Sequence, residues 1–347
     1  MVYNLVYAAA AFVTVVLYGK YDASKIIYML FLVFLFSFAA FRFEVGCDYY
    51  GYYDHSIMFA DLTFGEAATF REPGYWGTVV LLKRIGLDFP AINVVASAMF
   101  FLGVHSIARR QPNPLMYLTL LFPILVTGMP MSAVRQAMAM GFIAFAYNSF
   151  ADRKLISYII WVVIAGLFHS SAYLFLAGAP LIYKKGEVNR RIVGLVLVLC
   201  AIYFASSSDI AEQYSRTYIG TAIDAAGAKY RVGFVAFTGL VMLLLYRSKW
   251  QKFCPNDYEL AFYFSIASVA ILPLLVYSSV AGDRYGYYLM LITSLIQARL
   301  YLLTPPSLRQ PVFLAPLAIA GIQLLGWTML SALFDACYSE YKTWWSE

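Results

Sequence analysis

Long apolar runs, separated by short polar connections, fill almost the whole chain. The runs are continuous rather than alternating, and charged residues, proline or glycine mark their ends. A helix needs about 20 mostly apolar residues to cross a membrane, so the pattern predicts about 12 spans, give or take one or two. They are expected over residues 2–18, 25–41, 90–108, 114–130, 132–150, 155–168, 170–183, 191–206, 231–247, 257–278, 285–303 and 310–333.

Two of these segments, 155–168 and 170–183, are short for full spans. They fit either a broken pair of helices hinged at His169-Ser170-Ser171 or one long tilted helix. The pattern does not choose between the two arrangements.

The composition agrees with a membrane protein. Of the 347 residues, 62% are hydrophobic and 13% are charged, whereas a soluble globular domain has about 25% charged residues. Inside a bilayer each segment must satisfy its own backbone hydrogen bonds, which favours helices. The expected fold class is all-α: a polytopic transmembrane helical bundle forming a single integral membrane domain over residues 1–347. The net charge of +6 reflects basic loops on one side of the membrane and does not indicate nucleic-acid binding.

The orientation follows from the basic residues. Most lysines and arginines lie in short connections such as 109–110 and 153–154, and the positive-inside rule makes these connections cytoplasmic. Both termini and two longer loops, 43–89 and 207–230, then lie outside. Within the first loop, 75–85 is apolar but too short to cross, so we expect a short helix lying at the outer surface.

The stretch 42–54, at the start of the first outer loop, combines arginine, carboxylates, glycines and tyrosines. Such a mixture at the mouth of a span is typical of a surface that handles sugars and phosphates. Arg42 and Asp48 are candidates for direct contact with a substrate. Glu44 is a third candidate, unless it pairs with Arg42 as a structural clamp.

A second cluster follows at Arg71-Glu72-Pro73-Gly74-Tyr75-Trp76. Pro73-Gly74 predicts a turn, which would present the charged pair before it. Tyr75 and Trp76 could stack on a sugar ring, or could anchor the loop at the membrane interface. Arg71, Glu72 and Tyr75 are therefore candidate site residues.

Arg135 and Arg284 oppose the positive-inside bias, and each is expected at the outer start of a span. A guanidinium near helix N-terminal amides can bind a phosphate through two parallel hydrogen bonds. The structural alternative is an arginine that reaches the interface or pairs with a neighbour, as Asp283 could pair with Arg284. The candidate substrate-binding residues here are Arg135, Gln136, Asp283, Arg284 and Tyr288.

His169 lies beside two serines near the outer end of segment 155–168. It is either a proton acceptor or sugar ligand, or a hydrogen-bonded packing residue. Asp48, Glu72 and His169 are the catalytic candidates for a general base, in falling order of preference. The sequence contains no metal-ligand spacing and no phosphate-binding glycine loop, so neither a metal nor another cofactor is expected.

Four cysteines are present. Cys200 and Cys254 are expected to be free thiols, one within a span and one in a basic loop. Cys47 and Cys337 are both expected on the outer side, which leaves a disulfide between them open, because sequence alone cannot set their distance.

Five short motifs together resemble the EpsG family of Wzy-type polysaccharide polymerases. Their order and spacing extend over residues 42–288, and the family often has Thr or Ser where this chain has Cys47. The motifs are Arg42-Phe43-Glu44-Val45-Gly46-Cys47-Asp48-Tyr49, Glu72-Pro73-Gly74-Tyr75, Val134-Arg135-Gln136-Ala137-Met138-Ala139, Phe168-His169-Ser170-Ser171-Ala172 and Arg284-Tyr285-Gly286-Tyr287-Tyr288.

The resemblance implies a GT-C-like glycosyltransferase of the bacterial inner membrane that makes exopolysaccharide or O-antigen. Such an enzyme transfers a glycan from undecaprenyl pyrophosphate onto the next lipid-linked repeat at the periplasmic face. Outward-facing arginines of related proteins match Arg42, Arg135 and Arg284. These arginines would neutralise the departing pyrophosphate without a metal. The implied partners are a lipid-linked oligosaccharide, the membrane, a flippase and a chain-length regulator.

Other classes stay open at this point. A flippase or transporter of lipid-linked sugars would require paired repeats and broken midplane helices, whereas the charge in this chain gathers at one face. An O-antigen ligase or an acyltransferase would act at that same face. A structural subunit of an export complex is a further alternative.

Overall fold

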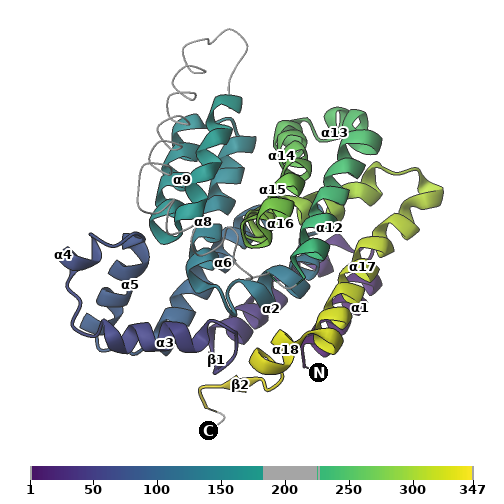
Figure 1. The fold of residues 1–347 in the computed structure, drawn as a ribbon. Coiled ribbons are helices and arrows are strands. Elements are labelled where there is room, and N and C mark those ends of the chain that lie inside the picture. The colour runs from purple at the N-terminus through teal and green to yellow at the C-terminus, as the bar shows by residue number, and fades with distance from the viewer. Residues whose placement is uncertain (1, 183–224, 226, 346–347) are drawn as a thin grey trace. The chain divides into compact units, whose positions relative to one another are not determined.

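The computed structural model describes residues 2–182, 225 and 227–345, and most of these residues are helical (Figure 1). The predicted span 191–206 and most of the predicted loop 207–230 lie outside the described residues. Every other predicted span overlaps helical structure. The helices concerned are α1 (Val2–Val16), α2 (Tyr21–Ala40), α6 (Pro90–Ala108), α7 (Pro114–Leu121) with η1 (Phe122–Val126), α8 (Val134–Ala151), α9 (Leu155–Phe168), η2 (Ser170–Leu181), α12 (Ala228–Val241) with η3 (Met242–Tyr246) and α13 (Arg247–Phe253), α14 (Tyr258–Ala270), α15 (Leu272–Tyr277), α16 (Ser279–Leu300) and α17 (Arg309–Leu330).

Within the described residues, six helices are long and apolar enough to cross a membrane. Shorter apolar helices fill several of the remaining predicted segments. The prediction of an all-α membrane protein is therefore confirmed. The six candidate spans are Asp22–Ala40, Pro90–Ala108, Ala228–Phe253, Pro255–Tyr277, Ser279–Leu303 and Pro306–Leu330.

The chain breaks at His169, as one of the two predicted arrangements requires. α9 ends at Phe168, and the 3₁₀ helix η2 begins at Ser170. The end of α9 packs on the start of α5 (Pro73–Arg84), where a Cβ added to Gly74 would lie 3.0 Å from the carbonyl oxygen of Leu167. The broken pair is confirmed, and one long tilted helix is not observed.

The chain separates into two compact units. Unit 1 comprises Met1–Phe142, Leu167–Ser170 and Gln297–Glu347. Unit 2 comprises Ile143–Gly166 and Ser171–Ile296. Each unit contains apolar helices.

In unit 1, α2 packs on α6 and α7, and α1 packs on α7 and α17. The first part of α8 crosses α6 with the two backbones in contact. A Cβ added to Gly103 would lie 2.3 Å from the carbonyl oxygen of Gly141, and one added to Gly141 would lie 2.2 Å from that of Met99. Small residues permit such close crossings between membrane helices.

The loop 43–89 of unit 1 folds into three short helices, α3 (Tyr49–Met58), α4 (Phe64–Ala67) and α5. Thr63 and Glu66 form a capping box that starts α4, and Pro73 occupies the first turn of α5, where proline is favoured. Helix α5 confirms the helix predicted over 75–85. Its location at the membrane surface remains a prediction.

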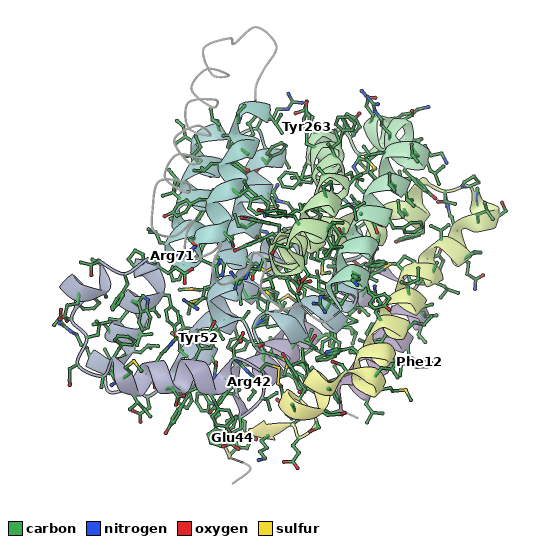
Figure 2. The ribbon with its side chains drawn as sticks, in the orientation of Figure 1. Phe12, Arg42, Glu44, Tyr52, Arg71 and Tyr263 are labelled. Carbon is green, nitrogen blue, oxygen red and sulfur yellow. A yellow bond between two sulfur atoms is a disulfide. The ribbon has the colours of Figure 1, made fainter. Side chains whose placement is uncertain are left out.

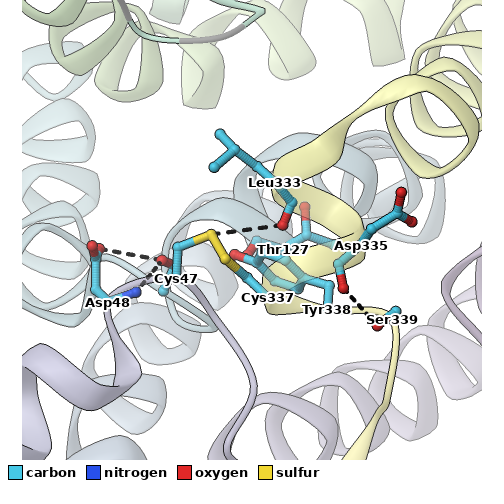
Figure 3. Close-up of a disulfide and its surroundings, with 9 residues drawn as sticks. Cys47, Asp48, Thr127, Leu333, Asp335, Cys337, Tyr338 and Ser339 are labelled. Carbon is cyan, nitrogen blue, oxygen red and sulfur yellow. Dashed lines mark hydrogen bonds between the residues drawn. A yellow bond between two sulfur atoms is a disulfide. The ribbon is translucent and has the colours of Figure 1, made fainter. Parts of the chain in front are cut away.

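The C-terminal end of unit 1 returns to the start of this loop. After α18 (Ala332–Cys337), strand β2 (Lys342–Thr343) pairs antiparallel with β1 (Arg42–Phe43). Cys47 and Cys337 form a disulfide with their Cα atoms 4.9 Å apart (Figure 3). The sequence could not decide whether this disulfide forms, and the structure contains it.

Unit 2 is held together by aromatic side chains. The ring centroids of Tyr147 and Phe264 are 4.7 Å apart, and those of Phe175 and Tyr288 are 5.1 Å apart. α12 packs closely on α14, because a Cβ added to Gly239 would lie 2.8 Å from the carbonyl oxygen of Ser265.

Candidate functional site

An ion pair between two predicted site residues forms the centre of the candidate site. Arg135, the second residue of α8, donates from Nη1 to Oε2 of Glu72 over 2.8 Å. Glu72 stands directly before α5 and is only 5% exposed. The Arg135 side chain is 35% exposed. One partner is therefore buried, while the other can still be reached from outside.

The break at His169 supplies a third element to this cluster. The backbone N–H of Ser170 donates to Oε1 of Glu72 over 3.1 Å. Arg71, which is labelled in Figure 2, lies beside this break. It donates from Nε and Nη2 to the Ser170 hydroxyl oxygen over 3.1 Å and 2.8 Å. α5, α8 and the break thus converge on Arg71, Glu72, Arg135 and Ser170, which we call the Glu72–Arg135 cluster.

Two tyrosine rings complete the surroundings of Arg135. Its guanidinium carbon lies 5.7 Å from the ring centroids of both Tyr52 and Tyr75, a distance at which cations and aromatic rings attract. Both rings are buried, and their centroids are 5.8 Å apart. Among the described residues, Nε of Arg135 has no hydrogen-bond partner although it is buried. The guanidinium therefore retains capacity to bind an anion.

Asp48 borders this cluster. Its carboxylate accepts a hydrogen bond from the Ser132 hydroxyl over 3.2 Å, and Ser132 lies just before α8. Tyr52 lies within electrostatic range of both Asp48 and Arg135: burial raises the pKa of Tyr52, the charge of Arg135 lowers it, and the charge of Asp48 raises it further. An exposed carboxylate and a guanidinium thus flank the same tyrosine.

Two predicted site residues lie elsewhere in unit 1. Arg42 is 1% exposed, and it donates to the carbonyl oxygens of Ala39 and Val45 and to Oδ1 of Asn93 over 2.8–3.0 Å. These contacts fix the end of α2. Glu44 does not form the suggested clamp with Arg42, because its carboxylate accepts from Lys342 over 3.2 Å.

Three further candidates lie in unit 2. Asp283 forms a two-point pair with Arg231, from Nε to Oδ1 over 2.8 Å and from Nη2 to Oδ2 over 2.7 Å. Arg284 follows it and is half-buried. Tyr288 is fully buried, and its hydroxyl lies 3.3 Å from that of Ser171.

The remaining two candidates are Gln136 and His169. Gln136 is buried beside Arg135 in the sequence of α8. His169 is half-buried and directly precedes Ser170 of the cluster.

Sequence reasoning did not select Tyr52, Ser132 or Arg231. A signal for Tyr52 exists, because it follows Asp48 by four residues and so shares a helix face with it. Within the described residues, no group of three or more His, Cys, Asp or Glu side chains is placed to hold a metal ion.

The chain as a whole can be compared with known proteins. The family model that matches this chain is that of the EpsG family, over residues 25–343. The chain belongs to the EpsG family. EpsG is a polysaccharide polymerase family, and the match includes every residue of the Glu72–Arg135 cluster. Neither the curated proteins nor the solved structures include a match to this EpsG chain.

Proposed function

We propose that this EpsG protein polymerises a polysaccharide at the periplasmic face of the bacterial inner membrane. It transfers a glycan from undecaprenyl pyrophosphate onto another lipid-linked repeat unit, within a GT-C-like bundle of about 12 spans. The observation that carries the proposal is Arg135, which is paired with Glu72 and lies near the rings of Tyr52 and Tyr75, with part of its side chain exposed.

The reaction needs an anion site and a base. A hydroxyl of the acceptor sugar attacks the anomeric carbon of the donor, and the bond from that carbon to the pyrophosphate oxygen breaks. Arg135 stabilises the charge that develops on the departing pyrophosphate. We propose Arg284 as a second phosphate ligand, on the strength of its motif.

Asp48 is the preferred base for the proton of the attacking hydroxyl. Its side chain is exposed and is engaged by the Ser132 hydroxyl. Both oxygens of Glu72 are already engaged, by Arg135 and by the Ser170 N–H, so Glu72 is better suited to orient the guanidinium. His169 is the remaining alternative.

The disulfide supports the outward orientation of this site. Disulfides form and persist in the periplasm and are rare in the cytosol. Cys47 directly precedes Asp48, and it is bridged to Cys337. The bridge and the positive-inside rule thus independently favour a periplasmic loop 43–89.

Alanine substitution of the arginines tests the proposal. Losing one charge-assisted contact that strengthens in the transition state should lower the rate about 10²–10³-fold, so Arg135→Ala and Arg284→Ala should abolish polymer. Arg135→Lys should also be impaired, because lysine lacks the planar fork. Polymer and single lipid-linked repeats are measured in cells at matched protein levels.

Arg309→Ala is the matched control. Arg309 donates to the carbonyl oxygen of Thr304, five residues earlier, and should be dispensable for polymerisation. A polymerase defect leaves single repeats at the outer face, whereas a flippase defect leaves them inside. Normal polymer in both Arg135→Ala and Arg284→Ala would refute the proposed anion site.

Metal independence is a separate expectation. The donor already carries a good leaving group, and arginines can neutralise its charge. Purified protein in nanodiscs should therefore extend lipid-linked repeats in excess EDTA at the rate seen without chelator. Loss of extension that magnesium or manganese restores would contradict this expectation.

A further inference from the structure

Asp48 occupies a position where an aspartate ordinarily caps a helix, yet its side chain does not cap. It directly precedes α3, and its carboxylate accepts no hydrogen bond from the backbone N–H groups at the start of that helix. Its carboxylate instead accepts from the Ser132 hydroxyl, while its own N–H donates to the same hydroxyl oxygen over 3.3 Å. Aspartate is among the strongest N-cap residues, but the Asp48 backbone is in the right-handed helical region (φ −90°, ψ 0°) and not in the extended region of a capping residue. A backbone constraint therefore keeps the side chain turned toward Ser132.

The turn that precedes Asp48 supplies that constraint. Gly46 has a left-handed φ of +104°, and a Cβ added to it would lie 1.9 Å from the carbonyl oxygen of Met131. The turn is thus pressed against the residue before Ser132. The Gly46 N–H donates to the carbonyl oxygen of Cys337 over 2.8 Å. The next residue, Cys47, forms the disulfide with Cys337 that Figure 3 shows.

The C-terminal segment, residues 332–345, is itself firmly held. The Tyr338 hydroxyl donates to the carbonyl oxygen of Thr127 over 3.0 Å. The Tyr341 ring stacks on Phe38 with centroids 4.3 Å apart, and Trp344 Nε1 donates to the carbonyl oxygen of Arg42 over 3.0 Å. Cys337 is therefore a fixed point to which the turn before Asp48 is tied.

We propose that the Cys47–Cys337 bridge orients the Asp48 carboxylate for proton transfer, so that both cysteines are positioning residues of the polymerase site. The inference rests on the proposed function, in which Asp48 is the base. Without the bridge, the Gly46 N–H would be the turn's remaining direct hydrogen bond to Cys337, and Asp48 could rotate to cap α3. Small displacements of a reacting group can lower a rate by up to about 10²-fold.

A double-mutant cycle tests the coupling on the full-length protein in nanodiscs. The variants are Cys47→Ala/Cys337→Ala, Asp48→Asn and all three changes together, with kcat and KM measured for chain extension. Removing the bridge should lower kcat roughly 10- to 100-fold with little change in KM. Asp48→Asn should lower kcat about 10²–10⁴-fold. Removing the bridge in the Asp48→Asn background should then not lower kcat any further, because the effects of coupled residues do not add.

Reversible reduction gives a second measurement on the unmutated chain. A reductant should slow extension by the same factor as the cysteine substitutions, and reoxidation should restore it. Cys254→Ala, which removes a cysteine outside the Cys47–Cys337 bridge, should leave both the rate and its sensitivity to reductant unchanged. The Cys47→Ala/Cys337→Ala protein should be insensitive.

The outcomes distinguish the assignment of Asp48 as the base from the positioning role of the Cys47–Cys337 bridge. If Asp48→Asn is as active as the wild type, the base assignment fails and the inference fails with it. If Asp48→Asn is inactive but the bridge is dispensable, only the inference fails. If removing the bridge lowers the rate by the same factor with and without Asp48, the bridge does not act through Asp48, and the inference is again overturned.

Discussion

Glu72 divides its carboxylate between two donors from distant parts of the chain. One oxygen accepts from Arg135, and the other accepts from the Ser170 N–H. Because the carboxylate is buried, these two contacts satisfy it and at the same time fix the guanidinium. The orientation of Arg135 therefore depends on a residue that need not touch the substrate.

Glu72→Gln is expected to impair polymerisation. Glutamine has nearly the same shape, but it removes the negative charge and leaves Arg135 without its carboxylate partner, so we expect chain extension to fall at least about tenfold. Chain extension by the purified protein measures the effect. Glu66→Gln is the control, because glutamine still completes the capping box of α4. Equal rates for the two variants would remove Glu72 from the site.

The types of site residue were visible in the sequence, but their partners were not. Arg135 and Glu72 were both selected by motif, yet 63 residues separate them, and no local rule pairs them. Asp283 was a candidate to orient Arg284 or to pair with it, whereas it forms a two-point pair with Arg231. Arg42 was selected for its charge, and only the structure shows that its donors hold backbone carbonyls. The roles of these residues in the reaction remain predictions.

At the scale of elements, the crossing of α6 and α8 fixes the start of α8 and hence the place of Arg135. Gly103 and Gly141 bring the two backbones into direct contact. A methyl group at either position would meet backbone atoms, which cannot rotate away as a side chain can. The crossing therefore tolerates glycine alone without a shift of one helix.

Gly141→Ala should destabilise unit 1. The added Cβ would lie 2.2 Å from the Met99 carbonyl oxygen, and overpacking of this kind costs about 1–3 kcal/mol. The midpoint of thermal unfolding in detergent measures the change. Gly77→Ala in α5 is the control, because no atom lies within 4 Å of its added Cβ, and it should be neutral or stabilising by about 0.4–1 kcal/mol. A higher midpoint for Gly141→Ala would show that the helices separate easily.

The apolar runs predicted the helices because burial in lipid demands continuous apolar surface. The same runs could not predict β1 and β2, which are two residues long and lie at opposite ends of the chain. The Cys47–Cys337 bridge was a named possibility that the sequence could not decide, since its two cysteines are 290 residues apart. Long-range pairing depends on how helices pack, and single-sequence periodicity does not contain that information.

At the scale of the whole molecule, the proposed orientation makes a direct prediction. Met58 in loop 43–89 and Ser307 in a basic connection are both exposed, and the positive-inside rule predicts that they lie on opposite sides of the membrane. In a chain without native cysteines, an impermeant maleimide should label Met58→Cys in intact spheroplasts. Ser307→Cys should be labelled only after the membrane is opened.

The reverse labelling pattern would invert the topology and place the Glu72–Arg135 cluster in the cytoplasm. It would also contradict a stable Cys47–Cys337 bridge, because the cytosol keeps thiols reduced. Labelling of both positions in intact spheroplasts would instead show that the membrane was not sealed, and adding a known cytoplasmic thiol to the assay detects this.

The separation of Cys47 and Cys337 also sets an order of events during synthesis. Cys337 follows Cys47 by 290 residues, so at roughly 5–20 residues per second it is made about 15 to 60 s later. During that interval Cys47 is a thiol without its native partner. The bond can close only when the helices between the two cysteines have entered the membrane and α18 has reached the same side as Cys47. Formation of the bridge therefore marks a chain whose insertion into the membrane is finished.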